Sequence, residues 1–129
     1  IINFGARLNE CLLANEILNK KGIGITLVDA RFVKPLDENL IWEIATNHEA
    51  IITIEEGSLG GFGSHVSQFL SEKKLLDNNL KFRSMILPDK FIDHNKPEIM
   101  YKEAGLDAEA IVSKVFDVLN SKVILQKQN

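Results

Sequence analysis

Short runs of apolar, β-branched residues alternate along this chain with longer segments of helical period. Four such runs lie at residues 1–4, 23–29, 50–54 and 80–87, and a polar or glycine-containing stretch and then a helical segment follow each of the first three. This alternation predicts an α/β fold, a three-layer α/β/α sandwich with a mostly parallel central sheet. The run at 50–54 is almost continuously apolar, as expected for a strand buried on both faces, whereas 80–87 alternates more and is expected at an edge.

The segments between these runs predict four helices. The first spans Leu8–Lys20 and stops at Gly22, because glycine readily takes the left-handed conformation that ends a helix. The second begins after Asp37, whose carboxylate can accept from the free N–H groups of the first turn. The third begins near Ser64, and Asp107 caps the last. The residues expected on the buried faces are, in chain order, Leu8, Leu12, Ile17, Leu18, Leu40, Ile41, Ile44, Ala45, Val66, Phe69, Leu70, Ala108, Ile111, Val112, Val115, Phe116 and Leu119.

Composition limits the class of protein and its partners. The 129 residues include 15 Lys+Arg and 18 Asp+Glu, a net charge of −3, with 45% hydrophobic and 26% charged residues, which is typical of one globular domain spanning residues 1–129. The basic residues are not clustered, so no nucleic-acid partner is expected, and no apolar run approaches the ~20 residues that cross a membrane. Cys11 has no partner for an internal disulfide, which fits a reducing compartment. The polar tail at 122–129 is expected to fray. Because the sequence opens inside a strand, we expect it to be a piece of a longer protein.

The richest local signal is the glycine-rich stretch E-E-G-S-L-G-G-F-G-S at residues 55–64, between a predicted strand and a predicted helix. A phosphate site is the first hypothesis for such a place, because helix N-termini offer free N–H groups. The spacing matches neither a dinucleotide fingerprint nor a P-loop, and Glu55 and Glu56 would repel an anion. We therefore favour a tight turn that permits close approach of a neighbouring segment, and we further expect the loop to contact a neighbouring domain or subunit. The residues of this possible interface loop are Gly60, Gly61, Phe62, Gly63 and Ser64, and Phe62 is its expected contact residue if it is exposed.

Other polar residues give weaker signals. Ser58 and Ser64 lack the flanking glycines of a nucleophile elbow, and a single histidine, His65, is more often a packing or surface residue than a base. A second possible site follows the last predicted strand, a strand-end turn with Asp89, Asp93 and His94. These groups could bind a metal ion, but their spacing matches no zinc or calcium loop, so a turn stabilised by aspartate is favoured. Asp29 and Arg31 are expected to form a local salt bridge.

Several stretches together resemble the C-terminal domain of the 1-deoxy-D-xylulose-5-phosphate synthase family. The most specific are R-F-V-K-P-L-D at residues 31–37 and L-P-D-K-F-I-D-H at 87–94, while E-E-G-S-L-G-G at 55–61 also suits transketolases and 2-oxo-acid dehydrogenase β subunits. The remaining matching stretches are N-F-G at 3–5, V-D-A at 28–30, T-I at 53–54, F-G-S at 62–64 and G-L-D-A at 105–108. The family usually has glycine where Asn95 stands, and asparagine tolerates a left-handed backbone.

The resemblance implies a role in a thiamine-diphosphate- and Mg²⁺-dependent transferase that condenses pyruvate with D-glyceraldehyde 3-phosphate, a step toward isoprenoids, thiamine and pyridoxal. It implies a mixed, five-stranded central sheet, packing against upstream cofactor-binding domains, a homodimer, and a location in the cytoplasm or a plastid-like organelle. The family's G-D-G…N cofactor motif does not occur in these 129 residues, so no catalytic, cofactor-binding or metal-binding residue is transferred, and the domain alone is expected to bind no cofactor and to be inactive. The alternatives are a C-terminal domain of a transketolase or of a 2-oxo-acid dehydrogenase β subunit, or a stand-alone regulatory module that binds a small anion.

Overall fold

A parallel sheet forms the middle layer of the structure, a computed structural model that describes the backbone of residues 1–127 and the side chains of residues 1–120. The strands are β1 (Ile2–Phe4), β2 (Val28–Ala30), β3 (Ala50–Glu55) and β4 (Lys81–Met85). They lie in the order β2-β1-β3-β4, and every pair is parallel. The described residues therefore form four parallel strands rather than the mixed sheet of five that the resemblance implies.

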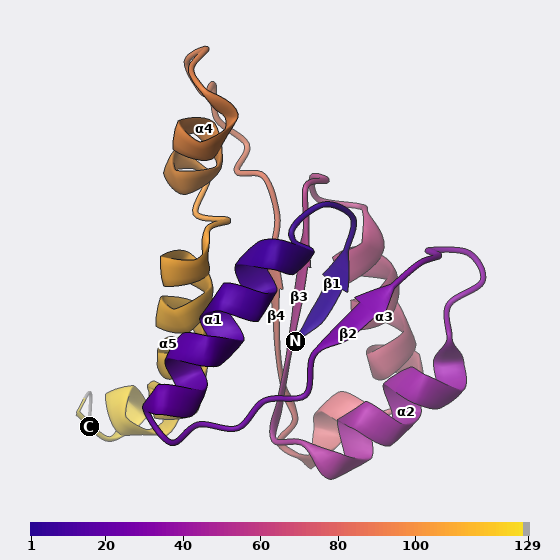
Figure 1. Ribbon diagram of the computed structural model, residues 1–129. Helices are drawn as coiled ribbons and strands as arrows, with labels where there is room; N and C mark the ends of the chain where they lie inside the picture. Colours follow the sequence, from indigo (N-terminus) through magenta and orange to yellow (C-terminus); the bar gives the residue numbers. More distant parts are fainter. Residues whose placement is uncertain (128–129) are drawn as a thin grey trace.

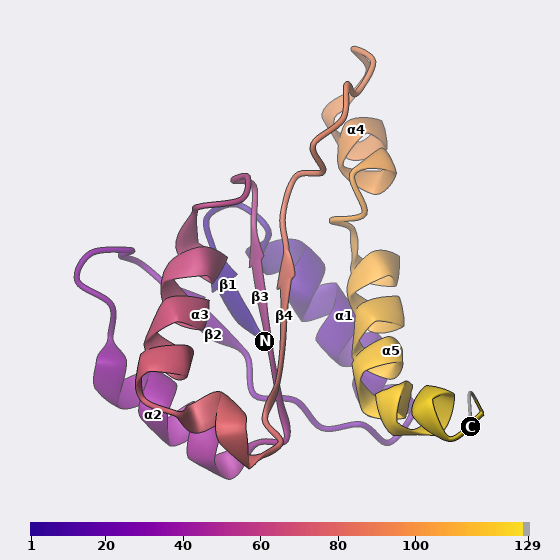
Figure 2. The same ribbon diagram turned by 180° about the vertical axis from the view of Figure 1, so that it is seen from behind.

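Helices cover both faces of this sheet (Figures 1 and 2). On one face lie α1 (Leu8–Lys20) and α5 (Ala108–Lys127), and on the other α2 (Glu38–Asn47), α3 (Phe62–Glu72) and a short 3-10 turn, η1 (Leu75–Asn78). A separate core fills each interface: Ile51 of β3 packs toward α2 and α3, and its neighbour Ile52 packs toward α1 and α5. The predicted three-layer α/β/α sandwich, with its central strand buried on both faces, is confirmed.

Strand boundaries differ from the prediction in one important place. The run at residues 23–29 enters the sheet only at Val28–Ala30, because its partner β1 offers three residues to pair with, from Ile2 to Phe4. Residues 23–27 instead run along the rim of the α1/α5 core, where Ile23, Ile25 and Leu27 are partly buried. The fourth strand is also shorter than residues 80–87 and lies at an edge, as expected.

The helices follow the predicted pattern with three differences. In α1 the buried residues are Cys11, Ala14 and Leu18, while Leu12 is 46% exposed, so its expected burial is wrong. The buried stripe of α1 runs through Cys11, Ala14 and Leu18 at i, i+3 and i+7 and packs in the core with α5, and Leu12 lies outside this stripe. Helix α3 begins at Phe62, two residues before the predicted start, and α4 (Pro97–Glu103) was not predicted.

Caps begin two helices as predicted. The Leu40 amide donates to Asp37 Oδ1 over 3.0 Å, and the Ala110 amide donates to Asp107 Oδ1 over 2.9 Å. Gly22 has φ +77° and ends α1, as expected. Residues 122–127 of the tail continue α5, and residues 128–129 lie outside the described residues, so the expected fraying stays a prediction. No helix in the described part of the chain is both long and apolar enough to span a membrane.

Candidate functional site

Parallel sheets bind ligands at the carboxyl ends of their strands, at the point where neighbouring loops diverge to opposite faces. A functional site is therefore expected at the carboxyl edge of this sheet, the side on which its strands end. Here the chain leaves β1 toward α1 on one face and leaves β3 toward α3 on the other, so the divergence lies between β1 and β3. The loop after β1 carries Arg7, and the loop after β3 carries Glu56 and the glycine-rich stretch. Each of these loops connects a strand to the helix that follows it.

The N-terminus of α3 is already occupied by a carboxylate of the chain. Glu55, the last residue of β3, is 3% exposed; its Oε1 accepts from the Phe62 amide over 3.0 Å and its Oε2 accepts from the Gly63 amide over 2.7 Å. A negative charge at a helix N-terminus is stabilised by the free N–H groups and the helix dipole. The chain thus places its own anion where a phosphate would bind.

The loop glycines are required for this close approach. A Cβ on Gly57 or Gly61 would collide with the Glu55 carboxylate. A Cβ on Gly63 would lie 2.7 Å from Thr53 Oγ1. Gly60 has φ +99°, which side-chain-bearing residues rarely adopt. The prediction of a tight turn is therefore confirmed, with the approaching group coming from β3 of the same domain.

Phe62 is a core residue rather than an exposed contact residue. It is 2% exposed, and its ring stacks on that of Phe4 with centroids 5.1 Å apart. It is the first residue of α3, so it turns inward under the loop. The exposed apolar side chain of this loop is instead Leu59, at 84%. Ser64 closes the loop by accepting from the Gly60 amide over 2.9 Å. An interface role for residues 60–64 stays a prediction, without Phe62 as its contact residue.

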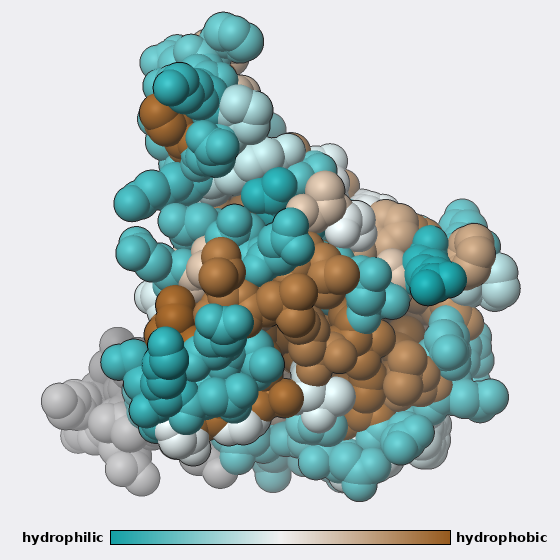
Figure 3. All heavy atoms as spheres, in the orientation of Figure 1, coloured by the Kyte–Doolittle hydropathy of each residue, from teal (hydrophilic) through white to brown (hydrophobic). Residues whose placement is uncertain are grey.

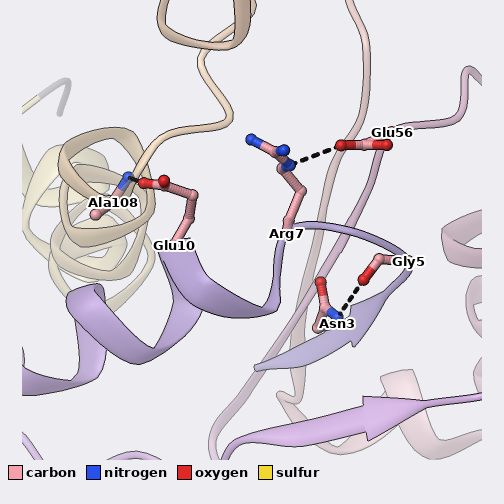
Figure 4. Close-up of polar contacts among 6 residues, drawn as sticks. All are labelled: Asn3, Gly5, Arg7, Glu10, Glu56 and Ala108. Atoms are coloured by element: carbon pink, nitrogen blue, oxygen red, sulfur yellow. Dashed lines mark hydrogen bonds and ion pairs between the residues drawn. The ribbon is translucent and has the colours of Figure 1, made fainter. Parts of the chain in front are cut away.

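Arg7, Glu56 and Tyr101 form a charged and aromatic cluster beside the point where the loops after β1 and β3 diverge. Arg7 Nε lies 2.8 Å from Glu56 Oε1 as an ion pair (Figure 4), and the Arg7 guanidinium lies 3.5 Å from the centroid of the Tyr101 ring. Hydrogen bonding to the Glu56 carboxylate, followed by burial, raises the pKa of Tyr101. The cluster joins the loops after β1 and β3 to α4, so we call it the latch. Sequence reasoning missed it because its members are 49 and 45 residues apart.

Asn3 and Asp29 link the ends of β1 and β2. Asn3 is fully buried, and its Nδ2 donates to the Gly5 carbonyl over 3.0 Å (Figure 4). The same Nδ2 donates to Asp29 Oδ1 over 2.7 Å. No ion pair between Asp29 and Arg31 occurs among the described residues, so the expected local salt bridge is wrong. Asp29 faces Asn3 because parallel pairing places these two residues opposite each other.

The strand-end turn with Asp89, Asp93 and His94 lies on an exposed loop. The Lys90 amide donates to the Pro88 carbonyl over 2.8 Å, so the chain turns here through its backbone. Stabilisation of the turn by an aspartate side chain stays a prediction. No group of three or more potential ligands gathers in the described part of the chain at a geometry suited to a metal ion. His65 and Ser58 are likewise not brought together into a nucleophile–base pair by any contact of the described residues.

An apolar hollow of about 290 Å³ opens beside β2. Its lining includes Val28, Ala30, Phe32, Leu36 and Leu40. Figure 3 shows a broad hydrophobic area in the middle of the face that Figure 1 presents. Ile2 of β1, Ile41 of α2 and Phe62 of α3 also line the hollow, so it lies on the α2 face of the sheet over β1 and β2. Asp29, Arg31 and Asp37 also line the hollow, although most of its surface is apolar.

Burial makes the one cysteine unreactive. Cys11 is fully buried in the α1/α5 core, and desolvation raises its pKa to about 11. A thiol with such a pKa is almost entirely protonated at neutral pH and is a poor nucleophile. Cys11 therefore serves in packing the α1/α5 core.

Comparison with known families identifies the architecture. Residues 1–111 match the transketolase C-terminal domain family. The matched segment runs from β1 into α5 and includes all four strands and both loops of the divergence point. This domain occurs in transketolases, 1-deoxy-D-xylulose-5-phosphate synthases and 2-oxo-acid dehydrogenase β subunits, which are thiamine-diphosphate-dependent enzymes. The chain belongs to the transketolase C-terminal domain family.

Proposed function

We propose that this chain is the C-terminal domain of a 1-deoxy-D-xylulose-5-phosphate synthase, and that it supports the enzyme's assembly without holding its cofactor. The observation that carries the choice among enzymes of this family is the pair of stretches at residues 31–37 and 87–94, both inside the matched segment. Both stretches lie in loops at the carboxyl edge, where strands β2 and β4 end.

The residues of this domain do not fit thiamine diphosphate and Mg²⁺. A diphosphate would need free N–H groups at a helix N-terminus, and at α3 those of Phe62 and Gly63 already bind Glu55. Mg²⁺ would need one or two carboxylates beside the diphosphate, and the exposed acids Asp89 and Asp93 lie on a loop after another strand. The cofactor therefore belongs to other domains of the proposed enzyme.

The proposed partners are those other domains and a second copy of the enzyme. An assembly role agrees with the exposed apolar side chains on the loops at the carboxyl edge, Phe32 at 70% and Leu59 at 84%. In the latch and in the Glu55 cap, polar groups at the strand ends contact other groups of the same domain. These groups stabilise the fold, which agrees with a structural rather than a catalytic role. A small-anion module is the weaker alternative, because the charge on Glu55 opposes an anion at α3.

The test is an assay of the complete polypeptide that contains this domain. The reading frame around residues 1–129 is determined, expressed, and supplied with thiamine diphosphate and Mg²⁺. We expect release of CO₂ from pyruvate that depends on D-glyceraldehyde 3-phosphate, with formation of 1-deoxy-D-xylulose 5-phosphate. Transfer of a two-carbon ketol unit between sugar phosphates, or acylation of a lipoyl acceptor, would instead assign the domain to a transketolase or a dehydrogenase β subunit.

A titration of the isolated chain separates the remaining alternative. Calorimetry with inorganic phosphate and with glyceraldehyde 3-phosphate should give no saturable heat. Saturable binding of either anion at micromolar concentration would favour the regulatory module.

A further inference from the structure

Thr26 and His48 form a polar pair at the amino edge of the sheet, on the side opposite the loops after β1 and β3. Thr26 lies in the segment that precedes β2, and His48 lies in the turn between α2 and β3. Figure 1 shows both stretches of chain at the lower edge of the sheet. Thr26 Oγ1 lies 2.8 Å from His48 Nε2, and Thr26 is exposed whereas His48 is half-buried. In this chain a molecule in solution can therefore reach the threonine hydroxyl.

A backbone carbonyl fixes the ring of His48. His48 Nδ1 lies 2.9 Å from the carbonyl oxygen of Ile44, in the last turn of α2. A carbonyl oxygen only accepts hydrogen bonds, so Nδ1 carries a proton, and in the neutral ring Nε2 presents its lone pair to Thr26. The Thr26 hydroxyl is then the donor to Nε2. This is the arrangement of a nucleophile with its general base, and the Ile44 carbonyl is the group that orients the base.

The end of α2 also favours a proton on this ring. His48 is the residue that follows α2, and the C-terminal end of a helix carries a partial negative charge. An imidazolium that forms when His48 takes the Thr26 proton is therefore stabilised by the helix dipole and keeps its hydrogen bond to the Ile44 carbonyl. The base is thus positioned in both of its protonation states.

An apolar hollow of about 110 Å³ opens beside the pair. Thr26 and His48 both line it, and its apolar lining includes Ile23, Ile25, Ile52, Val115 and Leu119. A water molecule takes roughly 30 Å³ in the liquid, so the hollow has room for a short alkyl chain of about four carbons. Glu49 also lines the hollow, and its charge disfavours an anionic ligand there. The hollow therefore suits a short, neutral, aliphatic group that lies against the Thr26 hydroxyl.

We propose that Thr26 and His48 form an acyl-transfer site, which takes a short aliphatic acyl group from a neutral activated ester. Thr26 Oγ1 attacks the carbonyl carbon of the ester while the hydroxyl proton moves to His48 Nε2. The bond from that carbon to the alcohol oxygen breaks, the alcohol leaves with the proton from His48, and the acyl group stays on Thr26 as an ester. This inference is independent of the proposed function, because no residue of the site comes from the carboxyl edge.

Acylation of the 129-residue chain by p-nitrophenyl butyrate tests this proposal. We expect a burst of p-nitrophenolate and, by mass spectrometry of the peptides, a butyryl group on Thr26. Thr26→Val should abolish both, because valine keeps the shape of the side chain without its hydroxyl, whereas Thr26→Ser should retain both. His48→Gln should slow the burst by roughly a hundredfold or more, the usual contribution of a general base.

Thr46→Val is the matched control. Thr46 is also exposed, but its hydroxyl donates to the carbonyls of Trp42 and Glu43 instead of to an imidazole. The control should leave the burst and the label on Thr26 unchanged. Urea melts of each variant give its stability, so loss of the label is separated from loss of the fold.

Three results would overturn the proposal. Butyryl groups found only on amines would show that the hydroxyl is not activated. An undiminished burst in Thr26→Val that is lost in His48→Gln would show that the imidazole itself is the nucleophile. Equal labelling of Thr26 in the parent chain and in His48→Gln would show that His48 does not act as a base. Labelling of Thr26 that requires His48 supports the site whether or not the complete polypeptide is a synthase.

Discussion

At the scale of single residues, Glu55 shows how a ligand site can be converted into a structural one. Helix N-termini after a parallel strand commonly bind phosphate, because their amides lack intrahelical partners. Here the last residue of β3 reaches across the turn and accepts from two of those amides. The three nearby glycines keep the backbone close enough for this contact. The loop glycines and Glu55, which suggest a ligand site in the sequence, therefore stabilise the fold.

Removing the Glu55 carboxylate should reopen an anion site. Glu55→Ala leaves two buried amides without their acceptor, and we expect it to lower the free energy of unfolding by about 3 kcal/mol. Acetate or phosphate should restore part of this loss in the variant and have little effect on the parent chain, as measured by urea melts. Glu49→Ala, at an exposed side chain, is the control. A variant of unchanged stability would show that water replaces the carboxylate fully.

Asp37 has a simpler role as a helix cap. Its carboxylate accepts from the Leu40 amide in the first turn of α2, so Asp37→Ala should lower the free energy of unfolding by about 1 kcal/mol. Urea melts give the difference, and Glu38→Gln, which lies in the same turn but makes no cap, serves as comparison. If stability were unchanged while the complete enzyme lost its chemical step, Asp37 would belong to the active site instead.

At the scale of elements, hydrophobic period predicted α2 and α3 well because each packs one face on a sheet. Ile41, Ile44 and Ala45 of α2 are buried as expected. The same reasoning failed at Leu12 of α1, because the buried stripe of this helix runs through Cys11, Ala14 and Leu18 and leaves Leu12 outside it. Helix α4 was missed because it has only seven residues and its apolar residues, Ile99, Met100 and Tyr101, are consecutive rather than at helical spacing.

The latch should control how firmly α4 is held. Arg7→Gln removes the ion pair with Glu56 and weakens the stack on Tyr101. We expect the amides of α4 to exchange severalfold faster in the variant while those of β3 and α3 exchange as before. Lys102→Gln is the comparison, since Lys102 lies on the same helix and faces Glu109 only at 3.9 Å, with both side chains exposed. Equal amide exchange rates of α4 in both variants would mean that the burial of Leu106, rather than the latch, keeps α4 in place.

At the scale of the whole molecule, the layered fold was predictable and the contacts at the carboxyl edge were not. Alternating apolar runs are a local signal, and they identify strands and helices without any knowledge of their neighbours. The latch joins residues from three separate segments, and the pairing of Asn3 with Asp29 depends on strand register, so neither leaves a local pattern. The role of Phe62 was mistaken for the same reason, because Phe4, on which it stacks, lies 58 residues away.

The last prediction concerns which part of the proposed enzyme binds the cofactor. This chain should not bind thiamine diphosphate with Mg²⁺, because Glu55 occupies the α3 N-terminus and the exposed acids Asp89 and Asp93 form no cluster with a third ligand among the described residues. Calorimetry of the 129-residue chain with cofactor and Mg²⁺ should give only heats of dilution, while the complete polypeptide binds saturably. Glu55→Ala is the informative variant, because weak binding of the diphosphate alone would show that the cap, rather than the shape of the loop, excludes the anion. Saturable micromolar binding to the unaltered chain would contradict the prediction and place a cofactor contact in this domain.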